Sequence, residues 1–184
     1  MTDLVTERLR LRRWSPSDRE PFALINSDPR VMEFMPALLS RGASDALILR
    51  IEDHFARHGF GLWAAELRLD SSFLGFIGLS IPVFEAAFTP CVEIGWRLAP
   101  AHWRQGLATE GAREVVRHAF DSLGLPSLVS FTVPPNLPSR RAMEKLGVTH
   151  NPSDDFDHPG LPPGHLLRRH VLYRLFNHNA PPLH

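Results

Sequence analysis

The chain has 184 residues, and its 43% hydrophobic and 22% charged residues are typical of one globular domain with a sizeable core. It carries 20 Lys and Arg residues against 20 Asp and Glu residues, and this lack of a basic excess argues against nucleic-acid and membrane-surface proteins. A single cysteine, Cys91, excludes an intrachain disulfide and favours a reducing, cytoplasmic compartment.

The first part of the chain predicts one strand and two main helices. Charged and apolar residues alternate over Thr6–Arg12, which is the period of a half-buried strand. A helix is expected over Pro16–Ile25, because proline is tolerated in a first helical turn. Arg30–Met35 is expected to form a short second piece. Ser44 is expected to cap a longer helix over Asp45–Arg57, whose apolar residues follow helical spacing.

Three strand-like runs come next, over Gly61–Leu69, Phe73–Ile81 and Cys91–Leu98. A short polar turn joins the first two runs, and a loop with two prolines leads to the third. Adjacent runs connected in this way predict an antiparallel meander.

The last part of the chain predicts two helices, two strands and one long loop. In order, these are a helix over Leu107–Ser122, a strand over Leu128–Val133, a helix over Asn136–Leu146, a proline-rich loop over Asn151–Gly164 and a strand over Leu166–Phe176. The fold class is therefore α+β (α/β mixed), with helices flanking a largely antiparallel sheet. We expect a single domain over residues 1–176 and a frayed C-terminal tail over residues 177–184. No signal peptide is evident, and no apolar run approaches the roughly 20 residues that span a bilayer.

A turn containing Gly106 and Ala108 connects the strand that ends at Leu98 to the helix that begins at Leu107. The first N–H groups of a helix have no intrahelical partners and lie at the positive end of the helix dipole. Small residues let an anion approach these groups, so the turn is a candidate phosphate-binding site. A glycine-containing turn without a ligand is the alternative that this stretch alone leaves open.

The same turn reads as a degenerate G-x-G-x-x-G, but a dinucleotide site fits poorly. Such a site requires the first parallel strand of a βαβ unit before the turn, and an acidic residue about 20 residues further on. Here the preceding strand belongs to an antiparallel meander. The next strand ends Phe131-Thr132-Val133, without a carboxylate to hold a ribose.

The segment Trp103-Arg104-Gln105-Gly106-Leu107-Ala108 resembles the Q/R-x-x-G-x-G/A turn of the GNAT superfamily of acyl-coenzyme A-dependent N-acetyltransferases. It matches at Gly106 and Ala108 and departs at the first position, where Trp103 stands. Trp at this position, followed by Ala-Thr-Glu, is typical of the branch that resembles ribosomal-protein N-terminal acetyltransferases of the RimJ/RimL type.

Two further segments extend the resemblance to nearly the whole chain, from Thr6 to Leu175. Asn136-Leu137-Pro138-Ser139, followed by Glu144-Lys145-Leu146-Gly147, is similar to the N-x-x-S…EKLG segment of that branch, and Thr6–Arg12 is similar to its first strand. The implied fold is a GNAT-like mixed, largely antiparallel twisted sheet, flanked by helices and splayed at the cofactor site.

The resemblance implies acetyl-coenzyme A as co-substrate, with no metal. The implied cofactor-binding residues are Trp96, Leu98, Arg104, Gln105, Gly106, Leu107, Ala108, Thr109, Asn136 and Ser139. The amides of the turn hold the pyrophosphate, and Arg104 adds a side-chain contact. The end of the strand at Trp96–Leu98 pairs with the pantetheine arm as one strand pairs with another. Asn136 hydrogen-bonds the arm from the other side.

Glu93 and Ser139 are the candidate catalytic residues. Glu93 is a carboxylate on the strand that runs into the turn, and it is the candidate base. The alternative is a strand glutamate paired with a neighbouring arginine. Many relatives use a tyrosine to protonate the leaving thiolate, but the corresponding helix position here is Met143, and the chain's one tyrosine is Tyr173. The acid role therefore passes to Ser139, near the thioester sulfur, or to water; Ser139 otherwise only bonds backbone at a helix start.

The predicted reaction moves an acetyl group directly from acetyl-coenzyme A to a primary amine. The acceptor is a protein or peptide N-terminus, or a small molecule such as an antibiotic, a polyamine or an amino acid. An acyl-coenzyme A-binding regulatory module without turnover is the alternative from another class. Nucleic acid and membrane are not expected partners, and the chain is expected to be a monomer or a homodimer.

Overall fold

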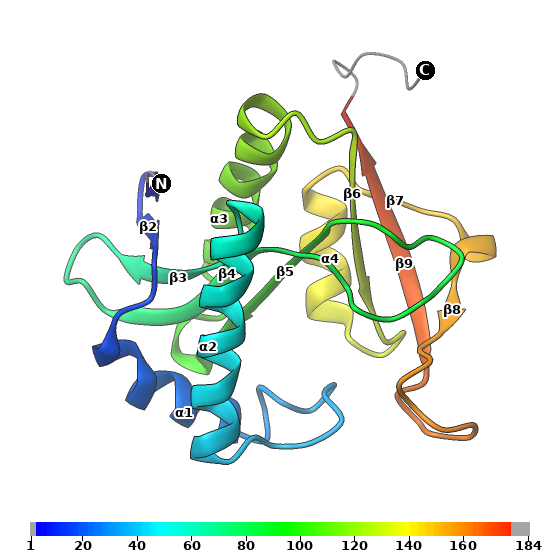
Figure 1. The fold of residues 1–184 in the computed structure, drawn as a ribbon, viewed down its shortest axis with the longest axis horizontal. Coiled ribbons are helices and arrows are strands. Elements are labelled where there is room, and N and C mark those ends of the chain that lie inside the picture. Colours follow the sequence, from blue (N-terminus) through cyan, green and yellow to red (C-terminus); the bar gives the residue numbers. More distant parts are fainter. Residues whose placement is uncertain (1–2, 178–184) are drawn as a thin grey trace.

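One twisted sheet organises the chain in the computed structural model, which describes residues 3–177 (Figure 1). The strands follow the order β1-β2-β3-β4-β5-β6-β9-β7, and β8 pairs with β9 beside this path. Their bounds are β1 Leu4–Val5, β2 Leu9–Arg12, β3 Leu62–Leu67, β4 Phe73–Ser80, β5 Glu93–Leu98, β6 Ser127–Thr132, β7 Thr149–His150, β8 Phe156–Asp157 and β9 Arg169–Phe176. The expected tail over residues 177–184 lies outside the described residues, apart from Asn177.

Every strand pair is antiparallel except β5 with β6, so the predicted mixed, largely antiparallel sheet is confirmed. The predicted meander corresponds to β3, β4 and β5. The two-residue strands β7 and β8 were not predicted. Strand β7 ends just before the segment expected to be a loop, and β8 lies inside that segment. Segments this short carry no readable period, so only their pairing with β9 defines them.

Helices cover both faces of the sheet. Their bounds are α1 Arg19–Ser27, α2 Arg41–His58, α3 Leu107–Arg117 and α4 Leu137–Lys145, with a π-helical turn over His118–Ser122 that extends α3. Phe76 of β4 packs in one cluster with Phe22 of α1 and Ile48 of α2. The next residue, Ile77, lies against Gly111 of α3. Successive strand side chains point to opposite faces, so α1 and α2 lie on one face and α3 on the other.

Two local predictions in the first part of the chain are wrong. Residues 30–35 form turns rather than a helical piece, within the long connection from α1 to α2. Helix α2 begins at Arg41, because the cap is Ser40, whose side chain accepts a hydrogen bond from the amide of Ala43. Ser44 is buried instead, and its hydroxyl accepts a hydrogen bond from Asn26 of α1 at 2.8 Å.

The parallel pair β5 and β6 opens after a single point of contact. Glu93 lies opposite Val129, and the amide of Val129 donates to the carbonyl of Val92 at 2.9 Å. The hydroxyl of Ser130 then reaches the carbonyl of Ile94 at 2.9 Å. Beyond Ile94, β5 is paired only with β4 over the described residues. The sheet is therefore splayed at the position where the sequence predicts the pantetheine arm.

A group of ion pairs links β2 to β3 and to the turn that precedes α1. Arg12 of β2 donates two hydrogen bonds to Asp18, at 2.7 and 2.8 Å, and one to Glu66 of β3 at 2.7 Å. Asp18 is 2% exposed. Burial opposes its charge, but the hydrogen bonds from Arg12 and from Ser15 outweigh burial and lower the pKa of Asp18.

We expect Asp18→Asn to lower the free energy of unfolding at pH 7 by about 3 kcal/mol, because it breaks a buried ion pair while Glu66 still holds Arg12. Because the pKa of Asp18 is lower in the folded than in the unfolded chain, its charge stabilises the fold at pH values above the unfolded pKa of about 4. This stabilisation is lost as the pH falls through the pKa of the folded state. Urea unfolding at pH 7 and pH 3 measures both effects. Asp53→Asn, which breaks an exposed pair with Arg57, is the control and should change stability by less than about 1 kcal/mol. Equal losses in both variants at pH 7 would contradict this account.

Candidate active site

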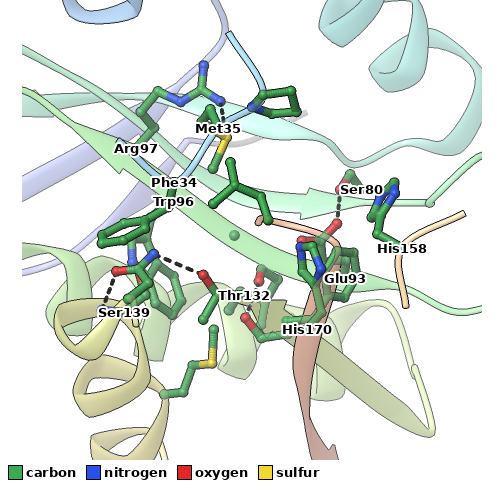
Figure 2. A pocket seen from close by; sticks show the side chains of 18 of the residues that line it. Phe34, Met35, Ser80, Glu93, Trp96, Arg97, Thr132, Ser139, His158 and His170 are labelled. Atoms are coloured by element: carbon green, nitrogen blue, oxygen red, sulfur yellow. Dashed lines mark hydrogen bonds between the residues drawn. The ribbon is translucent and has the colours of Figure 1, made fainter. Parts of the chain in front are cut away.

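A cavity of about 350 Å³ lies where β5 and β6 separate (Figure 2). It is bounded by the two strands, the start of α4, the α1–α2 connection and the segment between β8 and β9. The residues that line it include Phe34, Met35, Ser80, Glu93, Gly95, Trp96, Arg97, Thr132, Asn136, Ser139, Met143, His158 and His170. The cavity therefore brings together both residues predicted to be catalytic, Glu93 and Ser139.

Glu93 lies at one end of this cavity. The one hydrogen bond to its carboxylate among the described residues comes from the hydroxyl of Ser80 on β4, at 3.4 Å. Burial of the carboxylate raises the pKa of Glu93 from 4.5 to about 7, and the bond from Ser80 only partly offsets this. Glu93 forms no ion pair with any described arginine, so the alternative of a paired strand glutamate does not hold.

Two histidines that the sequence analysis did not single out as catalytic lie beside Glu93 (Figure 2). Nδ1 of His158 accepts from the amide of Gly160, which places its proton on Nε2. Nδ1 of His170 donates to the carbonyl of Arg168, which leaves its Nε2 as an acceptor. Burial lowers the pKa of both side chains and favours the neutral rings. The wall beside Glu93 thus offers one donor and one acceptor but no charge.

The carboxylates of the long loop before β9 are engaged elsewhere. Asp154 pairs with Arg174, Asp155 with His150, and Asp157 with Arg168 and Arg169. Glu93 is consequently the one carboxylate among the described residues that line the cavity.

Ser139 lies at the opposite end of the cavity, at the start of α4 (Figure 2). Its amide donates to Oδ1 of Asn136, which caps the helix. Its hydroxyl has no hydrogen-bond partner among residues 3–177. Asn136 also donates from Nδ2 to the hydroxyl of Thr132 at 2.9 Å. The side chain of Asn136 therefore already bridges α4 and β6, whereas the hydroxyl of Ser139 is available.

Tyr173 does not line this cavity. It is 2% exposed, accepts a hydrogen bond from Arg140 at 3.2 Å and packs beside Met143. Met143 lines the cavity where the resemblance expects a tyrosine. The hydroxyls of Ser139 and Thr132 line this end of the cavity, and Thr132 already accepts a hydrogen bond from Asn136.

The turn before α3 has the backbone that a close approach of phosphate needs. Gly106 caps the helix with φ +79°, and the preceding Arg104 also has a positive φ of 60°. The first intrahelical bond runs from Glu110 to the carbonyl of Gly106. The amides before Glu110 therefore have no intrahelical acceptor and face outward at the positive end of the helix. Arg104, Gln105 and Gly106 are exposed, and Leu107 contributes its side chain to the core.

Glu110 does not repel an anion at this turn. Its carboxylate accepts from the hydroxyl of Thr6 at 2.5 Å and from the backbone and side chain of Arg8 at 2.9 and 2.6 Å. Arg8 also donates to the carbonyl of Gln105 at 3.0 Å. The turn between β1 and β2 thus places Arg8 beside this segment, and no local pattern indicates this contact between residues about 100 positions apart.

Trp103, the residue that departs from the family pattern, anchors the turn to β5. Its indole N–H donates to the carbonyl of Leu98 at 2.8 Å. This bond occupies the carbonyl of Leu98. The backbone N–H and C=O of Trp96 face the open side of β5, because successive residues of a strand direct these groups to opposite neighbouring strands. Within the described chain no three His, Cys, Asp or Glu residues are grouped to hold a metal, and no helix could cross a membrane.

Comparisons with known proteins agree with this geometry. Residues 8–149 match the family described as acetyltransferase (GNAT) domain. The chain is 32% identical over 172 residues to the FsC-acetyl coenzyme A-N(2)-transacetylase of Aspergillus fumigatus, covering 88% of this chain and 71% of that protein. An acetyltransferase structure from Agrobacterium tumefaciens has a TM-score of 0.76 at 25% identity, covering 95% and 94% of the two chains. The Mycobacterium smegmatis RimJ, solved in complex with CoA-disulfide, has a TM-score of 0.73 at 20% identity, covering 95% and 84%.

Proposed function

The chain belongs to the GNAT acetyltransferase family, and from this premise we propose that it binds acetyl-coenzyme A across the turn and the splay and transfers the acetyl group directly to a primary amine. The observation that carries this proposal is one cavity that runs from Glu93 to Ser139 along the opening between β5 and β6.

The residues at the turn and the splay fit the cofactor. The free amides that follow Gly106 hold the pyrophosphate, and Arg104 and Arg8 lie close enough to the turn to add charge. The open backbone of Trp96 hydrogen-bonds the pantetheine arm. The bound cofactor supplies an activated acetyl thioester at the splay.

Glu93 accepts the proton that the amine loses as the new C–N bond forms. A base is most effective when its pKa is near the working pH, and burial brings the pKa of Glu93 to about 7. An α-amine has a pKa of about 7.7–8.0, against about 10.4 for lysine. Deprotonation of an α-amine by Glu93 is therefore close to balanced, whereas a lysine side chain requires about 3.5 kcal/mol more. We propose an α-amine as the preferred nucleophile.

The nitrogen named for the Aspergillus relative, N(2), agrees with an amine acceptor. Among acceptors, an N-terminal peptide amine and a small-molecule amine both fit this chemistry. Thiol release from acetyl-coenzyme A, measured with a panel of peptides and small amines, tests the proposed activity. Release that depends on an amine is expected. Tight coenzyme A binding without release from any amine would instead support the regulatory module.

We expect Ser139→Ala to lower kcat by about tenfold to a hundredfold, with little change in stability. The hydroxyl donates to the sulfur as the C–S bond breaks, and this effect is smaller than the roughly 10²- to 10³-fold cost of losing a donor from an oxyanion hole. The backbone cap at Asn136 remains in this variant because it uses the amide of Ser139. Ser153→Ala, in a second turn capped by Asn151, is the matched control. An unchanged kcat in Ser139→Ala would assign the proton to water.

A further inference from the structure

Three alternate positions of β5 face the acceptor side of the cavity. Glu93, Gly95 and Arg97 lie on one face of the strand, opposite Ser80, Gly78 and Phe76 of β4. Phe76 packs with helices α1 and α2, so this is the face covered by those helices. All three β5 residues line the cavity, and Figure 2 shows Arg97 beside Met35, well separated from Glu93.

Arg97 is a half-buried cation without a carboxylate partner among the described residues. It donates to Oδ1 of Asn26 at 2.6 Å and to the sulfur of Met35 at 3.4 Å, and its guanidinium lies 5.4 Å from the centre of the Phe76 ring. Burial lowers the pKa of Arg97 to about 10. A guanidinium has five N–H donors, and a neutral amide and a thioether do not balance its charge. Buried charges are normally paired, so this position calls for an anion.

Gly95 leaves free space between Glu93 and Arg97. A Cβ added at Gly95 would meet only the Glu93 carboxylate, at 3.9 Å. The neighbouring Gly78 of β4 differs, because a Cβ there would lie 2.2 Å from the carbonyl oxygen of Gly61. Packing of the protein therefore requires a glycine at position 78 but not at position 95. The absence of a side chain at Gly95 keeps the path along β5 open for a ligand.

We propose that the acceptor carries a carboxylate as well as its amine, and that Arg97 binds this carboxylate while the amine lies beside Glu93. This inference rests on the proposed function and names the class of acceptor. Residues four apart in a strand have Cα atoms about 13 Å apart. The amine and the carboxylate of the acceptor are therefore several bonds apart, as in a short peptide with a free N-terminal α-amine and a free C-terminal carboxylate. The bound carboxylate forms paired hydrogen bonds to the guanidinium, as arginine does with planar anions.

The test compares glycine peptides, from glycine to tetraglycine, with the corresponding C-terminal carboxamides, which have nearly the same shape but no negative charge. Thermal unfolding measures binding without turnover, because a ligand of the folded state raises Tm. In the wild-type protein we expect at least one of the longer peptides to raise Tm, and its carboxamide to have little effect. Thiol release from acetyl-coenzyme A should favour the same peptide over its carboxamide by about tenfold or more, as one charge-assisted hydrogen bond requires.

Variants of two residues separate this role from a purely structural one. Arg97→Gln should abolish the preference for the carboxylate, and Arg97→Lys should retain part of it. Because Arg97 also holds the buried Asn26, Gly95→Ala provides a second test. Its methyl group enters free space, so coenzyme A affinity and Tm without ligand should stay unchanged while the carboxylate-dependent rise in Tm is lost. Gly42→Ala adds a methyl group on the exposed surface of α2, also in open space, and is the matched control.

The outcomes separate the two proposals. Absence of any carboxylate-dependent rise in wild-type Tm, or the same rise in Gly95→Ala and in a folded Arg97→Gln, overturns the carboxylate site. If Arg97→Gln lowers thiol release equally for the peptide and for its carboxamide, Arg97 has a structural role, and this result also overturns the carboxylate site. A carboxylate-dependent rise without thiol release from any amine supports the site but contradicts the proposed acetyl transfer.

Discussion

Replacing Glu93 with glutamine should lower kcat for amine acetylation by about 10²- to 10⁴-fold, the range expected when a general base is lost. The variant keeps the shape of the side chain and its contact with Ser80 but cannot accept a proton. In the wild-type enzyme, activity should rise with pH through the pKa of Glu93, about 7. This limb should be absent in Glu93→Gln, whereas the limb of an α-amine acceptor, near 8, remains.

The same substitution should not destabilise the protein at pH 8. The pKa of Glu93 is raised on folding from 4.5 to about 7. The folded state therefore favours the protonated form of Glu93. The stability that this side chain provides is complete below about pH 4.5 and is lost as the pH rises through 7. Glutamine avoids this loss, so Glu93→Gln should unfold at or above the wild-type Tm at pH 8. Glu85→Gln, on the exposed part of the β4–β5 loop, is the control and should change neither activity nor Tm. A pH–rate profile that is identical in the wild type and Glu93→Gln excludes Glu93 as the base.

Replacing Gly106 with leucine should weaken coenzyme A binding by at least about a hundredfold. The side chain would stand over the amides that hold the pyrophosphate, and two or more charge-assisted hydrogen bonds of about 1.5 kcal/mol each would be lost. A left-handed conformation costs a residue other than glycine about 1–2 kcal/mol, so some loss of stability is also expected. Calorimetric titration with coenzyme A measures the affinity directly.

Gly124 provides the matched control for this effect. It also has a positive φ, of 65°, with no atoms near an added Cβ, and it follows the far end of α3. Gly124→Leu should cost similar stability and leave the coenzyme A affinity unchanged. Similar affinities in Gly106→Leu and the wild type would remove the turn from the cofactor site.

The parts of the site that could be predicted from the sequence are those defined by short, continuous segments. The small residues at Gly106 and Ala108 follow a strand and begin a helix, and the structure has this arrangement. Glu93 begins the strand that runs into the turn, and Ser139 lies in the first turn of the helix that follows β6. The structure places both residues in one cavity. The antiparallel meander also follows from the order and spacing of the strands, whereas the separation of β5 from β6 was implied by the resemblance to the GNAT superfamily.

Other parts of the site depend on contacts between distant segments. Arg8 alternates with apolar residues as any exposed strand arginine does, and only the fold places it at Gln105. Arg97 lies in an apolar strand, and its pairing with Asn26 rather than with a carboxylate depends on the packing of α1. His158 and His170 come from the segment before β9 and from β9 itself, and they reach Glu93 because β9 pairs with β6.

The most direct test of this account is a crystal structure of the protein with coenzyme A. We expect the pyrophosphate on the amides that follow Gly106, the pantetheine arm against the open edge of β5 at Trp96, and the sulfur between Glu93 and the hydroxyl of Ser139. Coenzyme A bound outside the opening between β5 and β6, or a sulfur that lies away from the cavity lined by Glu93 and Ser139, would contradict the account.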